Sequence, residues 1–122
     1  MTPNDLSTLL KKTDGLEQSP AVAALAAGNA KNFQVWLTNN DGYIVLNWNA
    51  PVVGNYDFIA LYAPGGNEND PKGYITRQWQ YASQGSPYTT GTYSGPGYIG
   101  VYWSWDVTQG TYVNVAESTP ST

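Results

Sequence analysis

The sequence predicts an all-β fold, a seven-stranded antiparallel β-sandwich with two short N-terminal helices. Seven segments alternate between apolar and polar residues with the period of a β-strand. Aromatic residues make up 14% of the chain and charged residues only 11%, a composition that suits pleated sheet faces. Thirteen glycines and eight prolines supply turns between the strands. A chain of 122 residues has the size of one domain.

Two helices are expected before the strands. A threonine cap followed by proline predicts a helix over residues 3–13, on which Leu6, Leu9 and Leu10 form one apolar stripe. A second Ser-Pro signal predicts a helix over residues 20–27, which a glycine ends. Both helices are too short to be stable alone, so each needs another surface.

Three parts of the chain follow from this pattern. Residues 1–31 form an N-terminal helical segment, residues 32–118 form the β-sandwich domain, and residues 119–122 form a flexible tail. Two roles stay open for the helical segment. It can cap one end of the sandwich, or it can pair with a second protomer and make a homo-oligomer.

The first three strands are expected in close succession. Residues 33–37 alternate, and a turn over residues 39–42 with an Asp-Gly pair leads into a second strand over residues 43–49. A proline-containing loop precedes a third strand over residues 56–63. A long polar loop over residues 64–73 follows it.

Four more strands are expected over residues 74–83, 88–93, 98–105 and 111–117. Residues 95–106 contain the most regular alternation in the chain. One parity carries aliphatic and indole side chains, which we expect to anchor the core: Ile99, Val101, Trp103 and Trp105. The other parity carries phenols and small residues, which we expect on a half-exposed face: Tyr98, Gly100, Tyr102 and Ser104.

Seven short strands with these turns favour a sandwich of the immunoglobulin or fibronectin type III kind, with a jelly roll or small barrel as the alternative. Three stretches carry a resemblance: Tyr56–Tyr62, Trp79–Tyr81 and Pro96–Tyr102. In these stretches the chain resembles SKICH-type modules and the accessory sandwich domains found beside calcineurin-like phosphatases. Ala60 stands where that pattern has glycine, and the helical N-terminus is not part of it. The resemblance implies a fold and says almost nothing about function.

Composition disfavours several classes of function. The net charge is −4 and the chain has only five basic residues, so a nucleic-acid interface or an anionic lipid surface is not expected. Cysteine and histidine are both absent, which removes thiolate chemistry, disulfides and the commonest general base. A hydrolase would need a carboxylate pair, for which Asp57 and Asp106 at strand ends are the candidates, and their loops are not expected to meet. We expect no enzymatic activity.

No secretory signal is recognised in the sequence. Asp5 precedes the first short apolar run, and Lys11 and Lys12 follow it. No apolar stretch reaches the length of a membrane span. Together with the absence of cysteine, these features lead us to expect a cytoplasmic protein.

Two groups of residues are candidates for carbohydrate binding. Amide and carboxylate side chains gather in two loops expected at the same end of the sandwich, and sugars pair their hydroxyls with such groups. The same residue types suit calcium, which is therefore a possible cofactor, and they are also ordinary turn residues. Aromatic side chains with one arginine form the second group. The candidates are Asn39, Asn40, Asp41, Asn67, Asn69, Asp70, Arg77, Trp79, Tyr81, Tyr93 and Tyr102.

The favoured function is that of a non-catalytic carbohydrate-binding protein, a lectin that binds glycans or glycoproteins and gains avidity by oligomerising through its N-terminal helices. The chain is similar in style to small cytoplasmic lectins, although it matches no named lectin family. Two alternatives stay open. One is an immunoglobulin-like protein–protein interaction module, and the other is a membrane-active toxin or cytolysin with tyrosine and tryptophan at a lipid interface.

Overall fold

The fold is mostly β, with seven strands in two antiparallel sheets and one α-helix in the part of the chain that is described. A computed structural model describes residues 18–28 and 30–122, and the helix expected over residues 3–13 lies outside them. The helical elements are α2 (Pro20–Ala26) and the 3-10 turns η1 (Ala30–Asn32) and η2 (Ala82–Gln84).

Helix α2 confirms the second helix that the sequence predicts. Ser19 is its N-cap, and the Ser19 hydroxyl accepts a hydrogen bond from the Ala21 backbone N–H at 3.2 Å. Pro20 occupies the first helical position, where no backbone donor is needed. The helix contacts β6 and β7, and Ala21 is fully buried there because its small side chain allows close approach.

One sheet has three strands in the order β1 (Gln34–Asn40), β2 (Tyr43–Asn49) and β5 (Tyr88–Tyr93). The two residues between β1 and β2 are Asp41 and Gly42, with φ values of 52° and 85°. Positive φ at both central positions is what a tight two-residue hairpin turn requires, and Asp-Gly adopts it readily. The hairpin expected from the sequence is therefore present.

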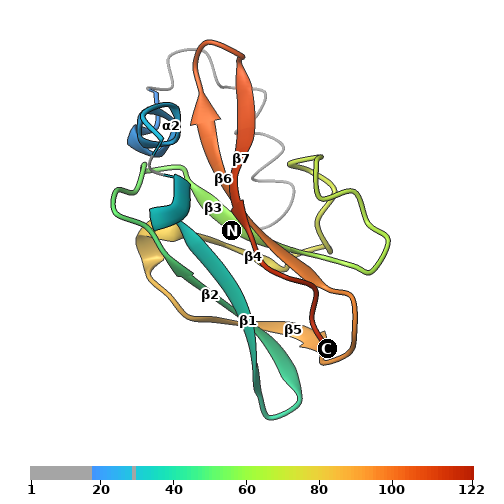
Figure 1. Ribbon diagram of the computed structural model, residues 1–122. Helices are drawn as coiled ribbons and strands as arrows, with labels where there is room; N and C mark the ends of the chain where they lie inside the picture. The colour runs from blue at the N-terminus through green and yellow to red at the C-terminus, as the bar shows by residue number, and fades with distance from the viewer. Residues whose placement is uncertain (1–17, 29) are drawn as a thin grey trace.

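The other sheet has four strands in the order β4 (Trp79–Tyr81), β3 (Phe58–Tyr62), β6 (Ile99–Asp106) and β7 (Thr111–Glu117). All neighbouring strands in it are antiparallel. Figure 1 shows the β1–β2 hairpin and β5 in the lower part of the view, with the long β6–β7 hairpin rising above them.

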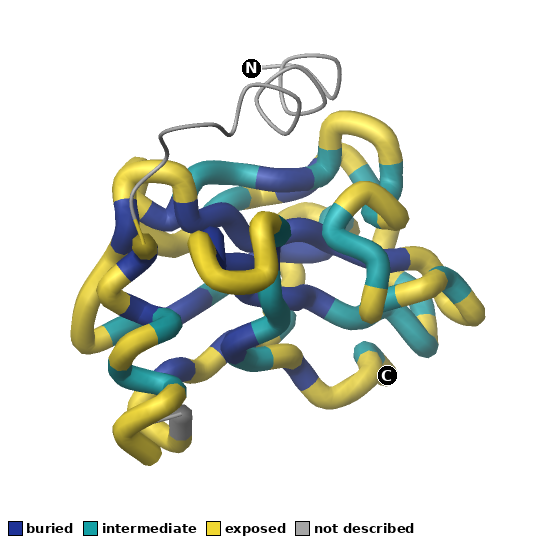
Figure 2. Tube along the Cα trace, turned by 90° about the horizontal axis from the view of Figure 1, so that it is seen from above, coloured by how far each residue is buried: buried dark blue, intermediate teal, exposed yellow. Residues whose placement is uncertain are grey.

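The two sheets share a buried core in a sandwich-like arrangement. Side chains from both sheets pack together in it, among them Leu46 of one sheet and Leu61 of the other. Gly100 of β6 lies directly against the other sheet, because a Cβ there would lie 2.9 Å from Leu46 Cδ2 and 3.1 Å from Val35 Cγ1. Figure 2 shows buried positions gathered in the middle of the molecule, with exposed positions in the loops around them.

A second buried cluster lies on the opposite, outer face of the four-stranded sheet. We call this surface the aromatic face; its large members are Phe58, Tyr62, Trp79, Trp103, Trp105 and Tyr112. The rings pack edge to face, with 4.9 Å between the centroids of Phe58 and Tyr112 and 5.8 Å between those of Phe58 and Trp79. Every one of these side chains is at most 5% exposed.

The face of β6 that packs against the other sheet is therefore not the one that the sequence analysis predicted. The parity of Tyr102 and Ser104, expected to be half-exposed, is buried, and the Tyr102 ring packs in the core between the sheets. The indoles of Trp103 and Trp105 lie on the outer face instead. Since both faces of this strand are covered, apolar content alone does not reveal which one meets the other sheet.

The fourth strand is shorter than expected. Residues 74–83 were expected to form it, but only Trp79–Tyr81 pair with β3. Arg77 has a φ of 68°, in the left-handed region that interrupts an extended strand. The backbone instead turns at this point, where the Gln78 N–H donates to the Ile75 carbonyl at 2.9 Å.

The C-terminal residues lie along the start of β6. The Ser121 hydroxyl accepts a hydrogen bond from the Tyr98 N–H at 2.9 Å and donates one to the Gly95 carbonyl at 2.6 Å. The Ser121 N–H donates to the Tyr98 carbonyl at 2.9 Å. The tail over residues 119–122, expected to be flexible, is thus attached to the sheet at this residue, beside the β5–β6 loop (Figure 1).

Candidate functional site

The outer face of the three-stranded sheet carries aromatic, amide and hydroxyl side chains with no charged one among them. It consists of the strand positions that alternate with the core-facing residues, and we call it the uncharged face. Its members are Gln34, Trp36, Thr38, Asn40, Tyr43, Val45, Asn47, Asn49, Thr89, Gly91 and Tyr93.

Two tyrosines are stacked at one end of the uncharged face. Tyr43 begins β2, Tyr93 ends β5, and the two residues are directly paired across the strands. Their ring centroids are 5.0 Å apart with an interplanar angle of 19°. Tyr93 is 71% exposed, the highest value for any large apolar side chain in the described part. An aromatic ring held in place by a neighbour, with its other side in water, is available to a ligand.

A third aromatic ring lies further along the same face. Trp36 of β1 is 40% exposed and is paired with Asn47 of β2. Asn40 lies four residues beyond Trp36 and pairs with Tyr43, so the indole and the stacked tyrosines are about 13 Å apart along the strands. A single sugar ring does not span that distance, whereas an oligosaccharide does.

Hydrogen-bonding side chains lie between the aromatic positions. The Asn47 amide nitrogen donates to Thr38 Oγ1 at 2.9 Å and to the Trp36 carbonyl at 3.3 Å. These bonds fix the amide group and leave its oxygen available as an acceptor. Val45 also lies on the uncharged face, but it is only 5% exposed.

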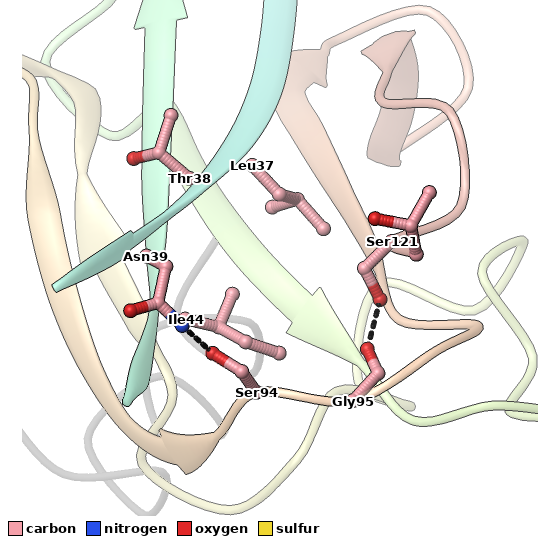
Figure 3. A pocket seen from close by; sticks show the side chains of 8 residues that line it. Leu37, Thr38, Asn39, Ile44, Ser94, Gly95 and Ser121 are labelled. Atoms are coloured by element: carbon pink, nitrogen blue, oxygen red, sulfur yellow. Dashed lines mark hydrogen bonds between the residues drawn. The ribbon is translucent and has the colours of Figure 1, made fainter. Parts of the chain in front are cut away.

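A hollow of about 280 Å³ opens at the same end of the sheet as the stacked tyrosines. Figure 3 shows its wall made by β1, β2, the β5–β6 loop and the C-terminal residues. The Asn39 amide donates to the Ser94 hydroxyl, and its oxygen accepts from the Gly42 N–H at 3.1 Å. Because these groups and Ser121 are already bonded to protein atoms, the hollow offers a ligand fewer free partners than the uncharged face does.

The loop residues expected to bind sugar lie at different places in the structure. Asn40 lies on the uncharged face, Asn39 lines the hollow, and Asp41 forms the hairpin turn. The loop between β3 and β4 uses its polar side chains for its own turns. Asn67 Oδ1 accepts from the Asn69 N–H at 3.1 Å, and Asp70 Oδ1 accepts from the Lys72 N–H at 2.9 Å.

The other candidates are also separated. Tyr93 lies on the uncharged face, while Trp79, Tyr81 and Tyr102 belong to the four-stranded sheet. Tyr102 is fully buried and Trp79 is 5% exposed, so neither presents a ring to solvent. Arg77, which was expected to share a strand face with Trp79 and Tyr81, precedes β4 in a left-handed turn.

Three residues of the uncharged face are not among the site residues predicted from the sequence: Trp36, Tyr43 and Asn47. The signal was present in the alternation of residues 33–37, because Trp36 falls on the parity opposite to Val35 and Leu37, and these two face the core. An aromatic residue on the polar parity of an edge strand indicates a ring in solvent.

The acidic and phenolic groups elsewhere have structural partners. Asp57 is 1% exposed and accepts from the Gly54 N–H, while Asp106 accepts from the Thr108 N–H in the β6–β7 turn. Burial raises the pKa of Tyr74 to about 12, and burial also raises the pKa values of Tyr62, Tyr102 and Tyr112 well above the ordinary value for a phenol. The hydroxyls of Tyr62, Tyr102 and Tyr112 donate hydrogen bonds to the Asp70 carbonyl, to Asp57 Oδ2 and to the Tyr56 carbonyl, respectively.

Comparison with protein-family models, with curated proteins and with solved structures found no match for this chain. Among the described residues, no three or more acidic side chains come together as metal ligands would. Within residues 18–28 and 30–122, no helix is both long and apolar enough to pass through a membrane.

Proposed function

We propose that the chain is a non-catalytic carbohydrate-binding protein that binds neutral oligosaccharides on its uncharged face. The observation that carries the proposal is the stacked pair of Tyr43 and Tyr93, one ring of which is 71% exposed on a face without charge. The exposed Trp36 on the same face adds a second stacking position.

The chemistry of this face suits a sugar better than other ligands. A pyranose ring has an apolar side of C–H groups that packs on an aromatic face, and hydroxyls that pair with amides and alcohols. Asn40, Asn47 and Thr38 supply those groups between the rings. An anionic or cationic ligand would find no opposite charge here to offset its desolvation.

The fold we infer is an immunoglobulin-like sandwich. In the constant immunoglobulin arrangement the fourth strand lies beside the fifth, on the sheet of the first two strands. Here β4 pairs with β3 instead, and the sheets have the orders β1-β2-β5 and β4-β3-β6-β7. This pairing favours the fibronectin type III kind of sandwich over the constant immunoglobulin kind.

Oligomerisation and calcium binding are two further predictions from the sequence. Oligomerisation through the N-terminal helices stays a prediction, although α2 already uses Ala21 and Ala24 to pack within its own protomer. A role for calcium also stays open, but the uncharged face contains no carboxylate to bind it.

The test is binding of the purified protein to an array of neutral glycans, with Tyr93→Ala as the variant. Tyr56→Ala is the matched control, because Tyr56 is also an exposed tyrosine at 43% but lies beside the four-stranded sheet, where its ring contacts Tyr81. We expect the Tyr93 variant to lose binding at least about tenfold, which corresponds to the loss of about 1.4 kcal/mol, while the control binds as the parent does.

Two outcomes would argue against the proposal. Absence of binding to every glycan, with or without calcium, removes the sugar as the ligand. Recovery of one stoichiometric protein partner, whose binding is lost in the Tyr93 variant, would favour the protein-interaction alternative on the same face.

A further inference from the structure

β1 is an edge strand that is open along its whole length. It pairs only with β2, without a shift of register, over Gln34–Asn40. In the described part of the chain, no backbone hydrogen bond joins β1 to any other segment. Five of its seven side chains are exposed. Charge, proline and bulges usually keep foreign strands away from an edge, and β1 has none of them.

The other three edges of the two sheets are less suited to pairing. β4 has only three residues, too few for a stable added strand. In β5 the Gly91 N–H already donates to Gln78 Oε1 at 2.6 Å. β7 ends with the charged Glu117, and its pairing with β6 contains a shift of register. β1 therefore offers a long, regular edge without charge.

The hairpin decides which backbone groups of β1 point to this open edge. Successive residues of an antiparallel strand bond alternately to one side and to the other. Asn40 and Tyr43 flank the two-residue turn, and such a turn is closed by a pair that exchanges both hydrogen bonds. Counting back from Asn40, the N–H and C=O groups of Val35, Leu37 and Asn39 are therefore the ones that point away from β2.

Two hydrogen bonds on the far side of β2 agree with this assignment. Trp48 and Ile44 of β2 pair with the first and the last of these three residues, so their backbone groups should point toward β5. The Trp48 N–H donates to Ser86 Oγ at 3.0 Å, just before β5. The Ile44 carbonyl accepts from Thr90 Oγ1 at 2.7 Å, within β5.

We propose that β1 pairs antiparallel with β1 of a second copy of this chain, about a two-fold axis at Leu37. Leu37 is the middle one of the three outward-pointing residues, so it meets Leu37 of the partner subunit, and Val35 meets Asn39 of the partner subunit. Every outward-pointing N–H and C=O of β1 then has a partner, whereas a shifted register leaves some of them unpaired. The half-buried Leu37 side chains also come together across the axis, with about 5.5 Å between their Cα atoms.

The charges at the two ends of β1 select an antiparallel second copy as the partner. Lys31 is the last charged residue before the strand and Asp41 is the first after it, and both are exposed. Antiparallel pairing brings Asp41 of the partner subunit opposite Phe33, about 7 Å along the strand from Lys31 and within reach of its side chain. Parallel pairing would instead bring like charges together at both ends.

This pairing joins the uncharged faces of the two subunits. The register sets even positions opposite even positions, so both uncharged faces lie on the same side of one continuous sheet. Trp36 then lies beside Thr38 of the partner subunit. That the joined face binds glycans at two sites, with added avidity, rests on the proposed function, whereas the pairing itself does not.

Amide hydrogen exchange at increasing protein concentration tests the interface without any sugar. We expect sedimentation to show a monomer–dimer equilibrium, and exchange at Val35, Leu37 and Asn39 to slow as the dimer forms. The Trp36 and Thr38 amides, which bond to β2, should exchange at the same slow rate throughout. A monomer at every concentration up to about 1 mM would overturn the proposal. A dimer in which the three outward amides still exchange fast would also overturn it, because another surface would then hold the dimer.

A reversal of charge supplies an independent measurement. Lys31→Glu places two carboxylates together at each end of the paired strands, so we expect the dimer dissociation constant to rise about tenfold at low salt. Adding Asp41→Asn removes this repulsion and should recover most of the loss, and asparagine tolerates the φ of 52° at this position. Lys72→Glu is the matched control, because Lys72 is an exposed lysine in the loop between β3 and β4.

Equal dissociation constants for the Lys31 and Lys72 variants would contradict the proposed register. Slow exchange of the outward amides and recovery by Asp41→Asn, in a protein that binds no glycan, would support the interface and refute the proposed function. Glycan binding by a protein that stays a monomer would do the reverse.

Discussion

Tyr102 donates a hydrogen bond from its hydroxyl to Asp57 Oδ2 over 2.9 Å in the buried core, joining residues 45 positions apart in the chain. Asp57 Oδ2 also accepts from the Gly54 N–H at 2.8 Å, whereas Asp57 Oδ1 has no partner in the described part. A buried carboxylate with so few donors depends strongly on each one. This bond also gives the Tyr102 hydroxyl the partner it needs in order to face the other sheet.

Removing that donor should destabilise the domain. Tyr102→Phe keeps the ring in the core but leaves Asp57 with one donor fewer, so we expect the free energy of unfolding to fall by about 1–3 kcal/mol. Urea denaturation measures the change. Tyr98→Phe is the control, since Tyr98 is half-buried and its hydroxyl has no hydrogen bond within the described residues. Equal stability of both variants would show that the Tyr102 bond contributes nothing.

Alkaline pH should destabilise the fold through the buried tyrosines. Burial raises the folded-state pKa values of Tyr62, Tyr74, Tyr102 and Tyr112 above the ordinary value of 10.0. A raised pKa contributes stability that is complete below pH 10 and is lost as the pH rises above it, by up to about 1.4 kcal/mol per pH unit for each buried group.

Chemical denaturation at a series of pH values from 8 to 12 gives the free energy of unfolding directly. Tyr112→Phe should lower the slope above pH 10, because one buried phenol no longer ionises on unfolding. A stability profile that stays level through pH 12 would contradict the burial of these hydroxyls.

Gly100 should not tolerate a side chain. A Cβ at this position would lie 2.9 Å from Leu46 Cδ2 and 3.1 Å from Val35 Cγ1, so Gly100→Ala forces the two sheets apart or moves these side chains. We expect a loss of about 1–3 kcal/mol in the free energy of unfolding. Gly91→Ala is the control, because the nearest atom to its Cβ would be 3.5 Å away, at the end of the Gln78 side chain. Equal thermal midpoints for the two variants would mean that the sheets are not closely packed at Gly100.

Several parts of the fold could be predicted because their signals are local. The Ser-Pro start of α2 and the Asp41-Gly42 hairpin each depend on backbone preferences of a few adjacent residues. The positions of six strands could be read from alternation for the same reason. The length of β4 could not, since an arginine at residue 77 gives no warning of a left-handed turn.

The candidate site was harder to predict because it depends on which face of each sheet is covered. Alternation identified the two faces of β6 correctly as separate surfaces, but both are buried, and the choice between them depends on distant residues such as Asp57. Tyr102 was therefore expected on a half-exposed face and lies in the core. Tyr93, a predicted site residue, lies on the uncharged face, and Trp36 lies there too, on the parity opposite to Val35 and Leu37.

Glycan binding should depend little on salt or on divalent metal. The uncharged face has no ionised side chain, so raising the salt concentration from 50 to 500 mM screens no contact there. EDTA should leave the dissociation constant unchanged, since no carboxylate on this face can hold calcium. Isothermal titration in these buffers provides the measurement. A large loss of affinity in salt, or in EDTA, would place the site among the acidic loops instead.

The five tryptophan indole N–H signals in a nuclear magnetic resonance titration with neutral oligosaccharide test the central claim most directly. Trp36 is 40% exposed on the uncharged face, while Trp48, Trp79, Trp103 and Trp105 are at most 5% exposed. We predict that the Trp36 signal shifts with increasing sugar and that the other four stay in place. A shift at Trp79 or Trp105 with Trp36 unmoved, or no shift at any sugar concentration, would contradict a glycan site on this face.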